Sequence, residues 1–181
     1  MSPLIPMYTV GLATREIILL EFSSSILCLI LAGKVGSSIT SEIGTMRVTE
    51  QIDALEIMGI NSANFLVLPK ITAFVSFIPI LVTMSMATSI LGGYLISVIT
   101  GIVSPEIFIY GIQTMFVEWY VWYALIKSLF FAFVISSVAS YFGYHVTGGA
   151  LQVGKASTNA VVTSSILILL LDVILTNLML Q

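Results

Sequence analysis

The longest uncharged segment of this sequence runs from Ile71 to Pro105 and contains no Asp, Glu, Lys or Arg. About 20 apolar residues are enough for a helix to cross the hydrocarbon core of a bilayer, so this segment exceeds one ordinary span. The rest of the chain agrees, because 58% of the residues are hydrophobic and only 8% are charged, whereas soluble domains carry roughly 25% charged residues. The sequence therefore predicts an all-α polytopic membrane protein.

We expect four membrane-spanning helices in a single domain over residues 1–181. Trp and Tyr side chains gather at residues 119–123, which is typical of a membrane interface and marks the start of the third span. Residues 1–14 contain two prolines and a glycine, which break helices, so we expect a loop there. The predicted spans are about 17–39, 71–100, 119–143 and 156–180, and a short external helix is predicted at about 105–117.

Residues 42–59, EIGTMRVTEQIDALEIMG, form the one polar island in this apolar sequence. On a helix, Val48, Ile52 and Leu55 form an apolar stripe, and three acids lie on the opposite face. This pattern predicts a short amphipathic helix at about 42–58, between two spans. Its charged residues, four acidic and one basic, are Glu42, Arg47, Glu50, Asp53 and Glu56.

The negative charge of this predicted helix indicates what it contacts. Helices that rest on anionic lipid headgroups are usually rich in Lys and Arg. An acidic helix is a poor lipid binder and a better ligand for a basic groove on a partner protein. The alternative is a solvated loop helix without a partner.

The distribution of Lys and Arg predicts the orientation of the chain in the membrane. The segment Lys34–Lys70 holds three basic residues and the loop Gly143–Lys155 holds one, whereas the connection Gly101–Glu118 holds none. We therefore expect the first two on the cytoplasmic side, and the connection and both chain ends outside.

Three ionisable residues fall inside predicted spans, where charge is costly and marks a function or a pair. Lys127 lies eight residues after the outer interface at Trp119, and Asp172 lies eight residues before Leu180. Both depths are about 12 Å at 1.5 Å per residue, so we expect an ion pair. This pair either fixes helix packing or serves ion coupling. The sequence offers no basic residue at the depth of Glu21, which is therefore expected to line a water-accessible cavity.

The sequence contains no motif of an enzyme, a metal site or a nucleotide site. HExxH, GxSxG and GxxxxGK[ST] are all absent. The only histidine, His145, has no Cys, His or acid at ligand spacing, and Cys28 is the only cysteine. The small net charge of −3 argues against nucleic-acid binding. We expect no catalytic residue, no metal and no cofactor.

The polar island and its flanks resemble the core signature of the MlaE (YrbE) permease family. The matching segments are AGKVGS at 32–37, EIGTMRVTEQIDAL at 42–55 and Met58-Gly59, and the resemblance runs from about Glu21 to the C-terminus. Members are the membrane subunits of Mce-associated ABC transporters, which move phospholipids or other lipids between membranes. Shorter matches are Ile126-Lys127-Ser128, Gly143-Tyr144, Gly148-Gly149, Val153-Gly154-Lys155-Ala156, Val161-Val162 and Leu171-Asp172.

The resemblance implies a homodimer in the bacterial inner membrane, with a cytoplasmic ABC ATPase and a periplasmic Mce-domain protein as partners. It implies that the 42–58 helix is the coupling helix seated in the ATPase, and that lipid is held in a cavity between the two permeases. An Arg-Glu pair lines this cavity in the family. Here Glu21 aligns with the acid and Leu20 replaces the arginine, unless Arg15-Glu16 takes over the role.

Family members normally carry an amphipathic helix and another span before the matched region. This chain begins too late for them, so the resemblance predicts that it is a truncated reading of a longer gene. Two other functions stay open from the residues alone. One is a secondary transporter that uses Lys127 and Asp172, and the other is a membrane scaffold that transports nothing.

Overall fold

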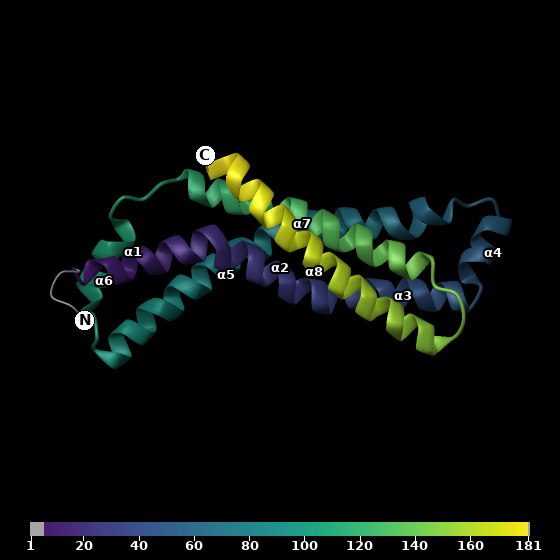
Figure 1. The fold of residues 1–181 in the computed structure, drawn as a ribbon, viewed down its shortest axis with the longest axis horizontal. Coiled ribbons are helices and arrows are strands. Elements are labelled where there is room, and N and C mark those ends of the chain that lie inside the picture. Colours follow the sequence, from purple (N-terminus) through teal and green to yellow (C-terminus); the bar gives the residue numbers. More distant parts are fainter. Residues whose placement is uncertain (1–5, 181) are drawn as a thin grey trace. The chain divides into compact units, whose positions relative to one another are not determined.

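The computed structural model describes residues 6–180, and every regular element in this range is helical (Figure 1). Four segments are long and apolar enough to cross a membrane, which confirms the predicted all-α polytopic fold. The elements, with η for wider π-helical stretches, are α1 (Tyr8–Ile17), η1 (Ile18–Ile26), α2 (Leu27–Leu31), η2 (Ala32–Gly36), α3 (Ser37–Val48), α4 (Gln51–Ile57), η3 (Ala63–Val67), α5 (Leu68–Thr100), α6 (Pro105–Gln113), α7 (Trp119–Tyr144) and α8 (Ala150–Leu180).

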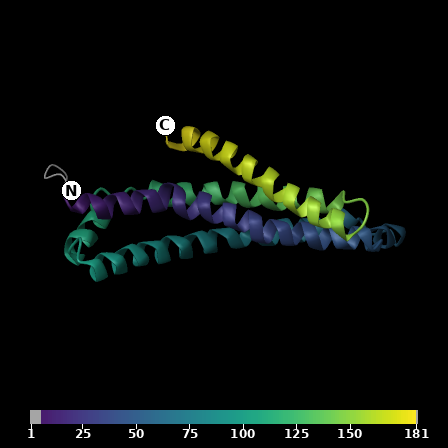
Figure 2. The same ribbon diagram turned by 60° about the horizontal axis from the view of Figure 1, so that its bottom comes forward.

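The helices form two compact units. The first combines the residues up to Leu27 with Ile80–Ile126, and the second combines Cys28–Pro79 with the residues from Lys127 on. In the first unit α1 packs across α6, and in the second unit α8 packs along α3 (Figures 1 and 2). The prediction of a single domain over residues 1–181 stays a prediction.

The first apolar helix begins earlier than the sequence suggested. It runs without interruption from Tyr8 to Val48, so the prediction of a loop is wrong for residues 8–14, while residues 1–5 lie outside the described residues. Gly11 is read from the sequence as a helix breaker, but it serves here as the contact point of α1 with α6. A side chain at Gly11 would collide with the carbonyl oxygen of Phe108. Close packing therefore outweighs the low helix propensity of glycine at this position.

The predicted helix at 42–58 is wrong as one helix, because the structure divides it in two. α3 ends at Val48, and Glu50 adopts a left-handed conformation with φ 61° and ψ 13° before α4 begins. The chain changes direction there, so Val48 leaves the apolar stripe that it was expected to share with Ile52 and Leu55. Both of these side chains still pack inward, with Ile52 fully buried.

A glycine follows the end of α4. Gly59 has φ 77°, its amide donates to the carbonyl of Glu56, and the amide of Ile60 donates to the carbonyl of Leu55. These two bonds form a Schellman motif, which satisfies the last carbonyls of the helix.

The other long helices differ from the prediction mainly at their starts. The second apolar helix runs over Ala63–Thr100 and continues through Pro79. α7 covers the predicted third span, whereas α8 begins at Ala150, within the stretch that was expected to be a glycine-rich loop. The short helix α6 ends at Gln113 rather than at residue 117.

Candidate functional site

The turn between α3 and α4 is anchored by an apolar core in the second unit. Ile52 is fully buried, and Leu55 packs against the same cluster. Each fully buried aliphatic side chain stabilises a fold by roughly 1.5–3 kcal/mol. α4 is therefore fixed on its inner face. The other buried members of the cluster are Ile39, Ile43, Leu66 and Ala139.

Three of the five charged residues predicted for this region form ion pairs within the chain. Arg47 donates through Nη1 to Oδ1 of Asp53 at 2.5 Å, and its guanidinium lies 6.0 Å from the ring centroid of Tyr144. Glu42 contacts the ammonium of Lys70 at 2.7 Å. These side chains are partly exposed, so each pair is worth roughly 0–1 kcal/mol.

Glu56 is tied to the end of α7 through two hydroxyl groups. Its Oε1 accepts a hydrogen bond from Ser62 at 2.8 Å and another from Tyr144 at 2.9 Å. The two hydroxyl oxygens lie 2.7 Å apart. The hydrogen bond from Ser62, followed by that from Tyr144, lowers the pKa of Glu56 from its ordinary value of 4.5.

Asp53 and Glu56 therefore both contact other residues of this chain. Glu50 is exposed and makes no side-chain hydrogen bond or ion pair to other residues in the described range 6–180. At the other end of α4, Ile57 is 88% exposed and Met58 is 65% exposed. Sequence reasoning missed these two apolar residues because they fall outside the predicted stripe. Two adjacent large apolar residues in a polar island, directly before a helix-ending glycine, were the available signal. We call Glu50, Ile57 and Met58 the α4 tip.

The structure brings together the two charged residues expected at equal depth. Nζ of Lys127 in α7 lies 2.5 Å from Oδ1 of Asp172 in α8, and the two side chains are 0% and 19% exposed. The ammonium also lies 5.9 Å from the ring centroid of Phe131. A charge-assisted contact of this length in an apolar environment links the two helices strongly.

The two candidate lipid contacts in the first helix, Arg15-Glu16 and Leu20-Glu21, have different surroundings. Arg15 is buried, pairs with Glu16 and donates to the carbonyl oxygens of Ile112 at 2.6 Å and of Thr114 at 2.8 Å. Its guanidinium therefore closes the end of α6, where helical carbonyls lack partners.

Glu21 lies instead in η1, where its Oε2 accepts a hydrogen bond from Ser25 at 2.8 Å. Both Glu21 and its neighbour Leu20 are half-buried. Wide π-helical turns of this kind occur frequently at functional sites. Of the two alternatives left by the sequence, the structure commits Arg15 to α6 and leaves Glu21 in an irregular stretch of the span.

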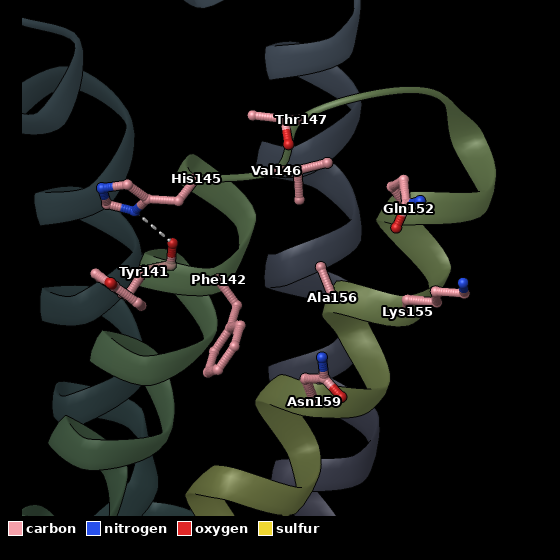
Figure 3. A pocket seen from close by; sticks show the side chains of 9 residues that line it. All are labelled: Tyr141, Phe142, His145, Val146, Thr147, Gln152, Lys155, Ala156 and Asn159. Carbon is pink, nitrogen blue, oxygen red and sulfur yellow. Dashed lines mark hydrogen bonds between the residues drawn. The ribbon is translucent and has the colours of Figure 1, made fainter.

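A cavity of about 350 Å³ lies between the end of α7 and the start of α8 (Figure 3). The imidazole of His145 contacts the carbonyl of Tyr141 through Nδ1 at 2.9 Å and points away from Gln152 and Lys155. The polar side chains around this cavity do not converge on one point. Among the described residues, no group of three His, Cys, Asp or Glu side chains could hold a metal ion.

Comparisons with known proteins give matches that cover nearly the whole chain. A family model described as Permease MlaE matches residues 3–178. A probable ABC transporter permease protein of Synechocystis sp. is 38% identical over 161 residues, which cover 89% of this chain and 61% of that protein. One of Rickettsia bellii is 41% identical over 150 residues (83% and 58%), and one of Pyropia yezoensis is 34% identical over 161 residues (89% and 61%). The chain thus spans about three fifths of the length of these curated relatives.

Proposed function

This chain belongs to the MlaE permease family, and from that premise we propose that it is the membrane subunit of an ABC transporter that moves phospholipid or a related lipid. The relatives are named probable ABC transporter permease proteins, which supports this proposal. The chain shows no nucleotide-binding motif in its sequence. In the proposed transporter a separate ATPase chain therefore hydrolyses ATP.

The α4 tip is the observation that carries the proposal. Ile57 and Met58, at the end of α4, expose large apolar side chains, and the acid Glu50, at its start, is exposed as well. Exposed large apolar residues on an otherwise polar helix are typical of protein-binding surfaces. The inner face of α4 is anchored by Ile52, so the tip is presented on a fixed support. We propose that it docks in a groove of the ATPase, which makes α4 the coupling helix.

The proposed orientation places the α4 tip in the cytoplasm of a bacterium with the chain in the inner membrane. A single cysteine at Ala54, which is exposed, in a Cys28→Ala background tests this placement. An impermeant thiol reagent should leave this cysteine unlabelled in intact cells and label it after lysis. Labelling in intact cells would contradict the orientation.

The lipid and the remaining partners follow from the family. We propose that two copies of the chain enclose a lipid cavity, with Glu21 as a residue that contacts the lipid and Leu20 beside it. A periplasmic Mce-domain protein then receives or delivers the lipid. The half-buried position of Glu21 in η1 supports this role, since an acid inside a span marks a function by default.

The Lys127–Asp172 pair has a structural role in this proposal. Each side chain contacts an opposite charge at 2.5 Å, so the pair fixes α7 against α8. An ion-coupled secondary transporter has to open such a contact during its cycle, so a pair that fixes two helices favours the ABC permease over this alternative.

The experiment that tests the proposed function is affinity purification in mild detergent, followed by identification of the chains and lipids that co-purify. We expect an ABC ATPase, an Mce-domain protein and phospholipid. Purification of the chain in folded form without any ATPase would contradict the proposal and favour a membrane scaffold.

A further inference from the structure

The contact of Glu56 with Ser62 and Tyr144 joins α4 to the long helix α7. Three oxygen atoms lie within 2.7–2.9 Å of one another, although the two hydroxyl groups supply only two protons. Both protons point at the carboxylate when Glu56 is ionised, so the charge of Glu56 holds the cluster together. The cluster is thus a polar link between α4 and α7 within the second unit.

The end of α7 is packed closely against α3. The hydroxyl of Thr40 in α3 donates to the carbonyl of Ala139 at 2.9 Å, and a side chain at Gly143 would collide with the backbone of Thr40. Tyr144 is the last residue of α7. A shift of α4 therefore pulls directly on the end of a rigid helix, which carries Lys127 about 25 Å away at 1.5 Å per residue.

The exposure of Glu56 separates the role of the cluster from that of the apolar anchor. Glu56 is exposed, and hydrogen bonds that water can replace contribute little to folding. Ile52 already fixes α4 to the core. A side-chain contact that is weak for folding but oriented between two helices is suited to passing on a movement.

We infer that Glu56, Ser62 and Tyr144 form the link through which a displacement of α4 reaches α7, with Tyr144 as its positioning residue. This inference rests on the proposed function, because the displacement is supplied by the ATPase. It assigns to Glu56 a contact inside the permease instead of a contact with the ATPase.

The test uses the complete transporter, purified with its co-purifying chains and reconstituted in proteoliposomes. Tyr144→Phe removes one hydroxyl group and keeps the ring that faces Arg47. We expect the ATPase to remain bound and ATP hydrolysis to continue. The amount of a fluorescent phospholipid transferred per ATP hydrolysed should fall at least about fivefold, as the loss of coupling between two sites suggests.

Tyr141→Phe is the matched control. Tyr141 is exposed, lies one turn earlier in α7, and its hydroxyl makes no hydrogen bond to other described residues. This variant should transfer as much phospholipid per ATP as the unmodified protein. Glu56→Gln keeps an acceptor oxygen, so its phospholipid transfer per ATP should lie between those of Tyr144→Phe and Tyr141→Phe. If Tyr144→Phe does not accumulate, Glu56→Gln and Ser62→Ala are measured in its place.

The outcomes separate this inference from the proposed function. Unchanged transfer per ATP in Tyr144→Phe, or in its substitutes, would overturn the link. Loss of the ATPase from this variant would also overturn it, because the cluster would then be a docking site. Absence of an ATPase from the unmodified complex would instead contradict the proposed function.

Discussion

The ion pair between α7 and α8 and the ion pairs around the α3–α4 turn use the same chemistry in opposite environments. Lys127 and Asp172 are 0% and 19% exposed, whereas Glu42 and Lys70 are 57% and 23% exposed. The contact distances are 2.5 Å and 2.7 Å. Distance alone therefore does not distinguish them, and the difference lies in the surroundings.

This difference decides what each contact contributes. A buried charge that loses its partner cannot be stabilised by water, so breaking the pair is costly. An exposed charge exchanges its partner for water at little cost. The buried contact therefore determines whether the helices assemble, while the contacts of the turn are free to change during a functional cycle.

The largest effect is expected at the buried pair. Asp172→Asn or Lys127→Met leaves the other charge without its partner in an apolar environment, at a cost of about 3–5 kcal/mol. Each variant should lower the thermal stability and the abundance of the protein. The double variant should recover part of the loss, and simple additivity in the double-mutant cycle would show that the two residues are not coupled.

Two arginines show the same contrast between a buried and a partly exposed environment. The side chain of Arg15 is 2% exposed and that of Arg47 is 35% exposed. Arg15→Met leaves carbonyl groups at the end of α6 without partners and should destabilise the protein by about 3 kcal/mol. Arg47→Met should cost less than about 1 kcal/mol. Thermal unfolding in one detergent measures both, and equal losses would remove the distinction between buried and exposed contacts.

The smallest effect is expected at Glu56, and it depends on pH. The folded-state pKa of this carboxyl group lies below its ordinary value of 4.5 because Ser62 and Tyr144 donate hydrogen bonds to it. Its contacts therefore stabilise α4 at pH values above 4.5 and are lost as the pH falls through the folded-state pKa. A carboxyl ¹³C NMR titration should give a midpoint below 4.5. Ser62→Ala should raise this midpoint, and a midpoint of 4.5 or higher in the unmodified protein would contradict the observed contacts.

The sequence predicts the membrane helices and the depth of their charges because both depend on local composition. A long stretch without charge has to lie in hydrocarbon, and equal spacing from two interfaces places Lys127 and Asp172 at one level. The start of the first helix was missed for the opposite reason. Gly11 is helical because α1 crosses α6 there, and a contact with a segment about a hundred residues away leaves no local signal.

The turn at Glu50 was also invisible in the sequence. Glutamate seldom adopts a left-handed conformation, so nothing in the pattern indicates a helix break there. With one continuous helix assumed, Arg47 and Asp53 are six residues apart and do not face each other. Only the change of direction at Glu50 brings them together, so that Asp53 is paired with Arg47 within the chain.

The α4 tip is the proposed docking site of the ATPase. Pull-down of the ATPase by the tagged permease from mild detergent tests it directly, with Glu50→Lys and Met58→Asp as variants of the tip. Glu118→Lys is the matched control, because it makes the same charge change at an exposed residue in the connection predicted to lie outside. We expect all three proteins to insert in the membrane, since insertion depends on the spans. The two tip variants should lose the ATPase while Glu118→Lys keeps it, and retention of the ATPase by both tip variants would contradict the claim.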